Sequence, residues 1–528
     1  MRQALLVLPV AAGIFTFLGF VPGEDGLRPL LTYALLLLPL AAGLTAFLVR
    51  GDAPRRKLLL WTAWLHFTLA AITIWDYNYR GPYADGGSTI APVWFAFDAL
   101  GLVFLGITSL LFLGAANYAA GYLASEKRDP GEDSDEGFIF NNAPEAVFTG
   151  CLLLFLSAMT AVAASRHMGL LWACVEATTL LSAPLIYFHR HKRSLEATWK
   201  YLLICSVGIA LALMGNLFLG AAGLKTGAGL DLQALLLRAG ALDAPLLKAA
   251  FLFLFVGYGT KMGLAPFHTW LPDAHSEAPA VVSALLSGAL LNCAFLGVLR
   301  VSSVCAAAGL ADFTGGIMVL FGLFSVITAA LFMLGQRDYK RLLAYSSIEH
   351  MGIIALGAGL GGGAVYGALL GAVSHSLTKA GLFFTSGLVL AAEKTKRISD
   401  VKGLWRRAPR TAALWLAGFF LITGTPPSGI FLAKFIILKE ALALKHYWLA
   451  AAFLVFLAIL FAGMARVFIG MVFGEREAKP GEKPYAEEAS MLVPAAVFFG
   501  CVVLAGLFIP EWFNSLLALA AQNIGGRP

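Results

Sequence analysis

Long apolar runs separated by short polar loops dominate this 528-residue chain. A helix that crosses the hydrocarbon core of a bilayer needs about 20 apolar residues, and about fifteen runs reach that length. The pattern predicts an all-α polytopic membrane protein with about 14–15 transmembrane helices. The runs cover residues 4–20, 29–49, 57–76, 97–122, 145–164, 169–188, 200–222, 246–265, 280–304, 313–335, 342–360, 364–391, 411–438, 447–473 and 491–519.

Two of these runs are interrupted by residues that weaken or break a helix. The run that starts at 246 meets Gly263 and Pro266, and the run 411–438 contains Pro426 and Pro427. In a bilayer, broken backbone is tolerated only where protein or internal water satisfies its polar groups. We therefore expect both breaks to face the interior of a helix bundle rather than lipid.

The interrupted runs occupy equivalent places in two sets of five runs, 145–304 and 313–473. Each set has an odd number of spans, so the second must have the opposite topology, which predicts two inverted five-helix repeats with a broken helix in each. Paired interruptions of this kind point to an ion site in repeat-built transporters. We divide the chain into an additional N-terminal helix (1–28), N-terminal helices with a cytoplasmic acidic loop (29–144), the repeat units (145–304 and 305–475), and a C-terminal loop with the last helix (476–528).

The charged residues set the expected orientation. Only 13% of residues are charged and 59% are hydrophobic, whereas soluble domains are about 25% charged. The net charge of +7 arises mostly in short loops after even-numbered runs, so it does not indicate nucleic-acid binding. The positive-inside rule places those loops in the cytoplasm, with the N-terminus cytoplasmic and the C-terminus outside. They carry Arg50, Arg55, Arg56, Lys57, Arg190, Lys192, Arg193, Arg337, Lys340, Arg341, Lys394, Lys396, Arg397, Lys402, Arg406, Arg407 and Arg410.

In the first repeat, Glu176 and Lys261 lie where the lipid core is expected. Ionisable residues inside a membrane are costly and mark ion or proton paths. Burial and a nearby carboxylate shift the pKa of a lysine in opposite directions, so a moving carboxylate can load or unload a proton. We predict a proton-transfer pair; the alternative for Glu176 is a protonated, hydrogen-bonded acid. Lys200, at the cytoplasmic edge of its run, is explained equally well by snorkelling.

The second repeat holds a larger group of polar residues. Glu349 and His350 are adjacent and should face different neighbours, whereas His375 and Lys379 are four apart and share a helix face. We predict a proton-relay pair there, with a packing histidine as the alternative. Lys434 follows the second break by about one and a half helical turns, where it either relays protons or anchors the helix end.

No metal centre or cofactor site is expected on this chain, and no catalytic residue. The six cysteines are scattered singly, mostly within apolar runs, without metal or iron–sulfur spacing. The stretch HTWLPDAH brings together His268, Asp273 and His275, but it flanks a membrane re-entry and is interpreted as a structural turn. Any electron-transfer chemistry must then belong to another chain.

Four motifs, KMGLAPFHTWLPDAHSEAP, RDYKRLLAYSSIEHMG, SHSLTKAGLFF and TGTPPSGIFLAKF, resemble the antiporter-like subunits of respiratory complex I, membrane-bound hydrogenases and Mrp-type antiporters. The resemblance implies a first half-channel with Glu176 and Lys261. It further implies a central hydrophilic axis with His350, His375 and Lys379, and a terminal lysine at Lys434. One departure is the neutral helix SALLSGALLNCAF, in which Ser287 and Asn292 stand where many members have a lysine or histidine. A relay through that helix needs water.

This departure, the Glu349–His350 pair and the end of the last run near Leu519 are similar to the F-type component of type-4 hydrogenases. The resemblance implies proton translocation in the cell inner (plasma) membrane, coupled to a peripheral redox arm on the cytoplasmic side and assembled with other membrane subunits. Two alternatives stay open: a subunit of an Mrp-type cation/proton antiporter, and a membrane subunit of an inorganic-carbon uptake system with a soluble zinc protein as partner.

Overall fold

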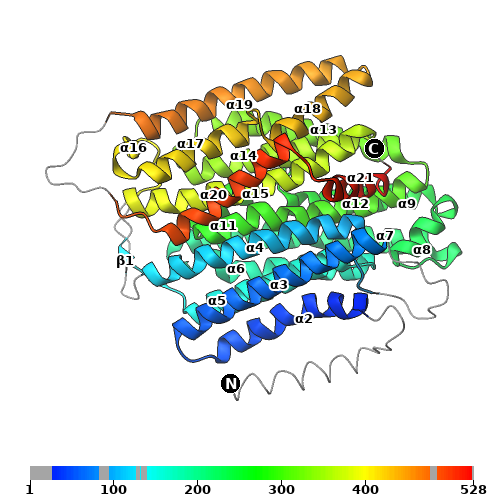
Figure 1. Cartoon of the computed structure of the whole chain (residues 1–528). Coiled ribbons are helices and arrows are strands. Elements are labelled where there is room, and N and C mark those ends of the chain that lie inside the picture. The colour runs from blue at the N-terminus through cyan, green and yellow to red at the C-terminus, as the bar shows by residue number, and fades with distance from the viewer. Residues whose placement is uncertain (1–26, 82–93, 127–130, 133–138, 476–484, 526–528) are drawn as a thin grey trace.

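A computed structural model of the chain describes residues 27–81, 94–126, 131–132, 139–475 and 485–525. Long helices run side by side along one axis of the molecule (Figure 1). Most of the predicted additional N-terminal helix, residues 1–28, lies outside the described residues.

Ten described helices are long and apolar enough to cross a membrane. Large apolar side chains lie on the outer surface, such as Trp61 (75% exposed) and Trp448 (91% exposed), as expected of a lipid-facing surface. The ten are α2 (Leu27–Leu48), α3 (Asp52–Arg80), α4 (Ala99–Ser125), α5 (Glu145–Ala164), α6 (Met168–Ile186), α7 (Lys192–Ala222), α11 through α12 (Ala280–Ala307), α13 (Ala311–Met333), α19 (Tyr447–Phe473) and α20 (Ala489–Leu507).

Further traversals come from helices that carry buried polar residues or are interrupted. These are α14 (Tyr339–Leu360), α15 (Gly363–Glu393), and two broken pairs, α9 (Ala244–Met262) with α10 (Trp270–Glu277) and α17 (Pro409–Thr423) with α18 (Gly429–Ala443). The predicted polytopic helical fold is therefore confirmed, with five helices in each repeat and the fourth of each interrupted.

Two details differ from the prediction. The run 491–519 is not one helix: α20 ends at Leu507 and α21 (Glu511–Gln522) starts after Pro510, which cannot donate the backbone hydrogen bond needed to continue a helix. The fold is also not purely helical, because three short antiparallel strands, β1 (Gly131–Glu132), β2 (Ile139–Asn142) and β3 (His189–Arg190), pair at one end of the bundle.

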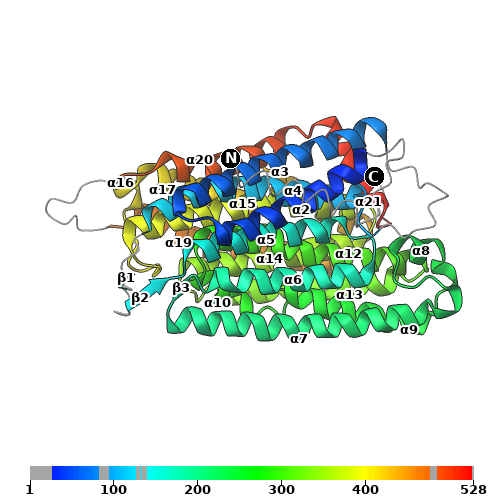
Figure 2. The same cartoon turned by 90° about the horizontal axis from the view of Figure 1, so that it is seen from below.

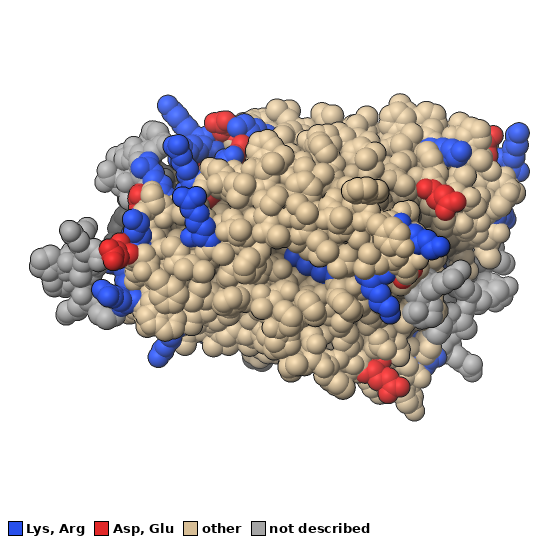
Figure 3. All heavy atoms as spheres, turned by 90° about the horizontal axis from the view of Figure 1, so that it is seen from above, with Lys and Arg blue, Asp and Glu red and all other residues tan. Residues whose placement is uncertain are grey.

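The end of the bundle that carries these strands is rich in lysine and arginine, and we call it the basic end. It also carries α16 (Leu404–Arg407) and the loops after α2, α6, α13 and α15 (Figures 1 and 2). Short helical turns η2 (Leu224–Thr226), α8 (Leu232–Leu237) and η3 (Ala239–Ala241) lie at the opposite end. On the face drawn in Figure 3, lysine and arginine side chains gather at the basic end, while others lie near the middle and at the opposite end, with uncharged surface between these groups.

Both breaks are capped by a glycine in the left-handed conformation. Gly263 (φ 79°) ends α9 and Gly424 (φ 84°) ends α17. Protein groups satisfy part of the freed backbone at the first break: the Trp270 indole N–H donates to the Thr260 carbonyl at 2.9 Å, and the Ala265 N–H donates to Ser325 Oγ at 2.9 Å. Gly263, Leu264 and Ala265 of the first break are buried, but Pro266 and, in the second break, Pro426 and Pro427 are exposed, so the expectation that both breaks face only the interior of the bundle is not met.

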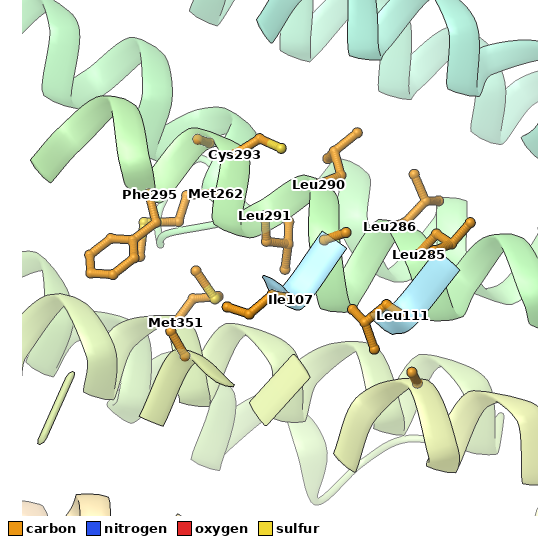
Figure 4. Packing of buried hydrophobic residues seen from close by; sticks show 14 of the residues in the cluster. Ile107, Leu111, Met262, Leu285, Leu286, Leu290, Leu291, Cys293, Phe295 and Met351 are labelled. Atoms are coloured by element: carbon orange, nitrogen blue, oxygen red, sulfur yellow. The ribbon is translucent and has the colours of Figure 1, made fainter. Parts of the chain in front are cut away.

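Helix α4 packs against both repeats, which also contact each other directly through α11–α12, α14 and α15. Figure 4 shows Ile107 and Leu111 of α4 packed between Leu285 and Leu291 of α11–α12 on one side and Met351 of α14 on the other. All five side chains are at least 95% buried. This dry packing holds the polar groups of the two repeats at fixed separations.

Candidate functional site

The buried lysine of the first repeat lies in the last turn of α9, directly before the break. The Lys261 side chain is fully buried, and its Nζ donates to Thr179 Oγ1 on α6 and to the Tyr201 hydroxyl on α7, the latter at 3.3 Å. Its Nζ also lies 5.4 Å from the centre of the Tyr201 ring, within range of a cation–π interaction. Three helices thus converge on this ammonium.

Glu176 reaches Lys261 through Thr179 rather than directly. The Thr179 hydroxyl donates to Glu176 Oε2 at 3.0 Å, and Ser206 donates to Glu176 Oε1 at 3.2 Å. A hydroxyl can accept one hydrogen bond while it donates another. The direct pair expected from the sequence is therefore replaced by a hydrogen-bonded chain of ammonium, hydroxyl and carboxylate, because the Glu176 side chain also reaches toward α7.

The second repeat contains a direct ion pair. Lys434 Nζ on α18 donates to Glu349 Oε1 on α14 at 3.1 Å, and the Thr423 carbonyl at the end of α17 lies 3.4 Å from the same Nζ. Both charged side chains are at least 90% buried. Removing one charge of such a pair would leave the other uncompensated in a medium of low dielectric constant.

The two carboxylate–lysine sets occupy equivalent places in the two repeats. Glu176 is on α6 and Glu349 is on α14, which are the second helices of their repeats. Lys261 and Lys434 are both on the broken fourth helices. The sequence places Glu349 beside His350 without indicating its partner, and the structure makes it the counterpart of Glu176.

Between these sets, the imidazoles of His350 and His375 stack with ring centres 5.2 Å apart. His350 Nδ1 donates to the Ser346 carbonyl at 2.8 Å. Lys379 Nζ donates to the Leu343 carbonyl at 2.6 Å and to Ser346 Oγ. Neither ring nitrogen of His375 has a hydrogen-bond partner among the described residues, so the predicted relay pair of His375 and Lys379 is not joined directly. The His375 ring lies against α14 instead, where Ser346 contacts both the lysine and the histidine pair.

The helix that follows the first break contains a π-helical turn at Leu286–Leu290. Ser287 Oγ hydrogen-bonds Ser347 Oγ at 2.8 Å, and Asn292 Nδ2 donates to Ser376 Oγ at 2.6 Å. π-helical turns are frequent at functional sites. The neutral residues of this helix thus tie it to α14 and α15, where the other polar groups lie.

Two more buried polar atoms among these groups, Asn292 Oδ1 and His350 Nε2, have no hydrogen-bond partner within the described part of the chain. Buried polar atoms of this kind are usually satisfied by ordered water. Water bound at these atoms can therefore complete a relay past the neutral helix that contains Ser287 and Asn292.

The remaining sequence-predicted groups lie elsewhere. Lys200 pairs with Asp273 at 3.0 Å and Glu196 at 2.6 Å at the basic end, with 46% of its side chain exposed. The three residues of the HTWLPDAH stretch do not converge: Asp273 also bonds Arg341, His268 packs edge-on against Tyr345, and His275 is buried. Across the described ranges, His, Cys, Asp and Glu form no group suited to a metal ion.

A family model described as "NADH:quinone oxidoreductase/Mrp antiporter, TM" matches residues 165–460, which is more than half of the chain. The chain belongs to this family. It is 36% identical over 429 residues to the hydrogenase-4 component F homolog of Methylacidiphilum infernorum, covering 80% of this chain and 87% of that protein. It is 29% identical over 492 residues to NADH-quinone oxidoreductase subunit N of Desulforudis audaxviator, covering 90% and 94%.

Solved structures share the fold of this antiporter-family chain. A chain of respiratory complex I from Thermus thermophilus with bound NADH matches with a TM-score of 0.77 and 24% identity, covering 94% of this chain and all of that one. A chain of the Mrp complex from Dietzia sp. matches with a TM-score of 0.79 and 19% identity, covering 94% and 98%. The chain is thus a multi-pass membrane protein whose structural neighbours are components of multi-subunit membrane complexes.

In this family member, the sequence located the breaks and most of the charged groups but missed the residues that connect them. Thr179 and Ser346 look like ordinary helix residues, because a buried hydroxyl usually bonds its own helix backbone. A useful signal was available for Thr179, since it follows Glu176 by three residues and must share a helix face with it.

Proposed function

We propose that this chain is the proton-translocating membrane subunit of a complex I-like or membrane-bound hydrogenase assembly of the hydrogenase-4 type. The observation that carries this proposal is the series of buried titratable groups between the two broken helices. It starts at Lys261, with the half-buried Glu176 near it, continues through His350, His375 and Lys379, and ends at Lys434. Burying an ionisable group inside a membrane protein is costly, so packing alone does not explain so many of them, whereas a proton relay requires them.

The first repeat can move a proton without leaving a charge stranded. Lys261 passes a proton to the Thr179 oxygen while the Thr179 hydroxyl proton passes to Glu176, along the two hydrogen bonds of the bridge. The lysine becomes a neutral amine, the carboxylate becomes a neutral acid, and Thr179 is unchanged. Neutralising both groups is favourable in a low-dielectric interior.

In the second repeat, Lys434 and Glu349 exchange a proton directly across 3.1 Å. Protons reach this pair from Lys379 and the stacked histidines, and water completes the connection to Asn292 and Ser287. The proton is then released along α18 toward the end of the bundle opposite the basic end. Lys200 takes no part in this path, because its ion pairs belong to the surface of the basic end.

We further propose that the basic end faces the cytoplasm in the inner membrane and that a peripheral redox arm docks there beside the other membrane subunits. The positive-inside rule supports this orientation. A reporter fused after Arg407, between α16 and α17, should remain cytoplasmic, and one fused at the C-terminus should be exported. The reverse pattern would exchange the two sides of the path.

An Mrp-type cation/proton antiporter subunit is the second candidate, since the matching family model includes Mrp antiporters and the Dietzia Mrp chain shares the fold. An inorganic-carbon uptake subunit has no observation in its favour in the described structure. The two leading candidates differ in their driving force, because only the first needs electron transfer in a partner subunit.

The test is proton transfer by the purified complex in proteoliposomes that contain a luminal pH dye. Addition of the electron donor should acidify the lumen, and Glu176→Gln should assemble yet lose most of that signal. Acidification driven by a sodium gradient without electron donor would favour the antiporter instead. Normal pumping by an assembled Glu176→Gln complex would remove Glu176 from the path.

A further inference from the structure

The short helix α10, which follows the first break, lies between a charged cavity and the buried polar groups around Lys379. Its last residues, Ser276 and Glu277, line a cavity of about 350 Å³ at the basic end. The residue before them, His275, is fully buried on the inner side. Three consecutive residues thus connect the cavity with the interior.

The cavity is walled by charges of both signs. Glu277 pairs with Lys396 at 3.0 Å and lies 3.5 Å from His191 Nε2. Asp338 accepts from Ser276 Oγ at 2.5 Å. A polar cavity of this size can hold water, which brings protons from the solvent to the cavity side of α10.

The His275 side chain makes no hydrogen bond within the described part of the chain, although its backbone carbonyl accepts one from Ser283 Oγ at 3.1 Å. Neither of its ring nitrogens has a hydrogen-bond partner there, although the side chain is 0% exposed. Its ring instead stacks on Phe383 of α15, with centres 4.7 Å apart and planes at 14°. A fully buried imidazole with both nitrogens unpaired is rare in native proteins, which points to water at one or both nitrogens.

The stacking places His275 on the route to the central lysine. Phe383 follows Lys379 by four residues, so both lie on one face of α15, about one turn apart. Because α15 runs toward the basic end, Phe383 and His275 lie on the cavity side of Lys379. The charged neighbours of His275 are Lys379 and, toward the cavity, Lys340, whose Nζ bonds the Ser276 carbonyl at 3.3 Å.

We infer that His275 is the proton-entry residue of the central axis, carrying protons from the charged cavity to Lys379. This inference rests on the proposed function, since it names the intake of that path. One ring nitrogen accepts a proton from water on the cavity side while the other nitrogen releases its proton to water on the Lys379 side. The imidazole ends as the other neutral tautomer, and rotation of the ring about its side-chain bonds returns the protonated nitrogen to the Lys379 side before the next transfer, so charge and atoms balance in each cycle.

The experiment compares His275→Phe with the wild-type complex in proteoliposomes, using electron-donor-driven acidification of the lumen. Phenylalanine preserves the ring and its stacking on Phe383 but has no nitrogen. We expect assembly and electron transfer to an artificial acceptor to be retained, while the initial rate of proton transfer falls about tenfold or more, as for the loss of a positioned acid–base group. If His275→Phe does not assemble, His275→Gln replaces it, with the same expected loss.

The matched control is His268→Phe, which changes a second buried histidine of the same segment that packs on Phe332 and Tyr345. This variant should pump normally. Normal pumping by His275→Phe, with Lys379→Ala inactive, would overturn the entry role and leave the proposed function intact. Normal pumping by Lys379→Ala as well would contradict the proposed function itself.

Discussion

The buried lysines of the two broken helices are held by different kinds of acceptor. Lys261 donates to two hydroxyl groups and reaches its carboxylate through one of them, whereas Lys434 contacts a carboxylate and a freed backbone carbonyl. A hydroxyl bridge transmits a proton only while it keeps both hydrogen bonds. The first repeat therefore depends on Thr179 as much as on the charged residues.

Thr179→Val should interrupt the bridge while leaving Glu176 and Lys261 in place. Valine has nearly the shape of threonine but cannot donate or accept, so we expect assembled complex with most redox-driven proton transfer lost. Thr178→Val is the matched control, because the Thr178 hydroxyl bonds only the Val175 carbonyl of its own helix at 2.6 Å. Equal pumping by both variants, measured with a luminal pH dye, would show that Thr179 is not a proton carrier.

Glu349→Gln should destabilise the protein, because it leaves the Lys434 charge buried without its partner. Loss of one member of a buried pair typically costs about 3–5 kcal/mol. The double variant Glu349→Gln/Lys434→Met should recover most of that stability and still fail to pump. Thermal unfolding of the detergent-solubilised complex compares the stabilities of the wild type and the two variants. A Glu349→Gln variant as stable as the double variant would contradict the ion pair.

At the level of elements, the left-handed glycine of the second break has a specific neighbour. A β-carbon at Gly424 would lie 3.2 Å from Lys434 Cδ, in addition to the strain of a left-handed residue, about 1–2 kcal/mol. Gly424→Ala should therefore lower stability and also displace the lysine. We expect reduced pumping as well as a lower unfolding midpoint.

Gly309→Ala provides the comparison for that variant. Gly309 has a similar φ of 78°, and nothing lies within 4 Å of its would-be β-carbon. It should lose comparable stability but pump normally. If the two variants have the same pumping rate, the cap at Gly424 does not position Lys434.

The elements themselves were largely predictable from the sequence. Gly263, Pro266, Pro426 and Pro427 marked both breaks, because such residues inside an apolar run disfavour a continuous helix. The split between α20 and α21 was missed, because the apolar residues on both sides of Pro510 and Glu511 resemble a single run. The π-helical turn Leu286–Leu290 has no sequence signature, and strands of two to four residues are too short to show a period.

At the scale of the whole molecule, the odd number of spans in each repeat was enough to predict inverted topology. The partners of the buried charges were not predictable in the same way. Lys434 and Glu349 are 85 residues apart, and Lys261 and Thr179 are 82 apart, so their contacts depend on how the helices pack. Sequence reasoning therefore found the donors, and the fold determined their acceptors.

The whole-molecule account predicts that protons cross the membrane by way of titratable groups in both repeats. The most direct test is electron-donor-driven acidification of proteoliposomes by a complex carrying Lys434→Arg. Arginine keeps the positive charge beside Glu349 but cannot readily release a proton, because its pKa lies above about 12. We predict an assembled complex that has lost most proton transfer while it still reduces an artificial acceptor. Wild-type acidification by this variant would contradict the account.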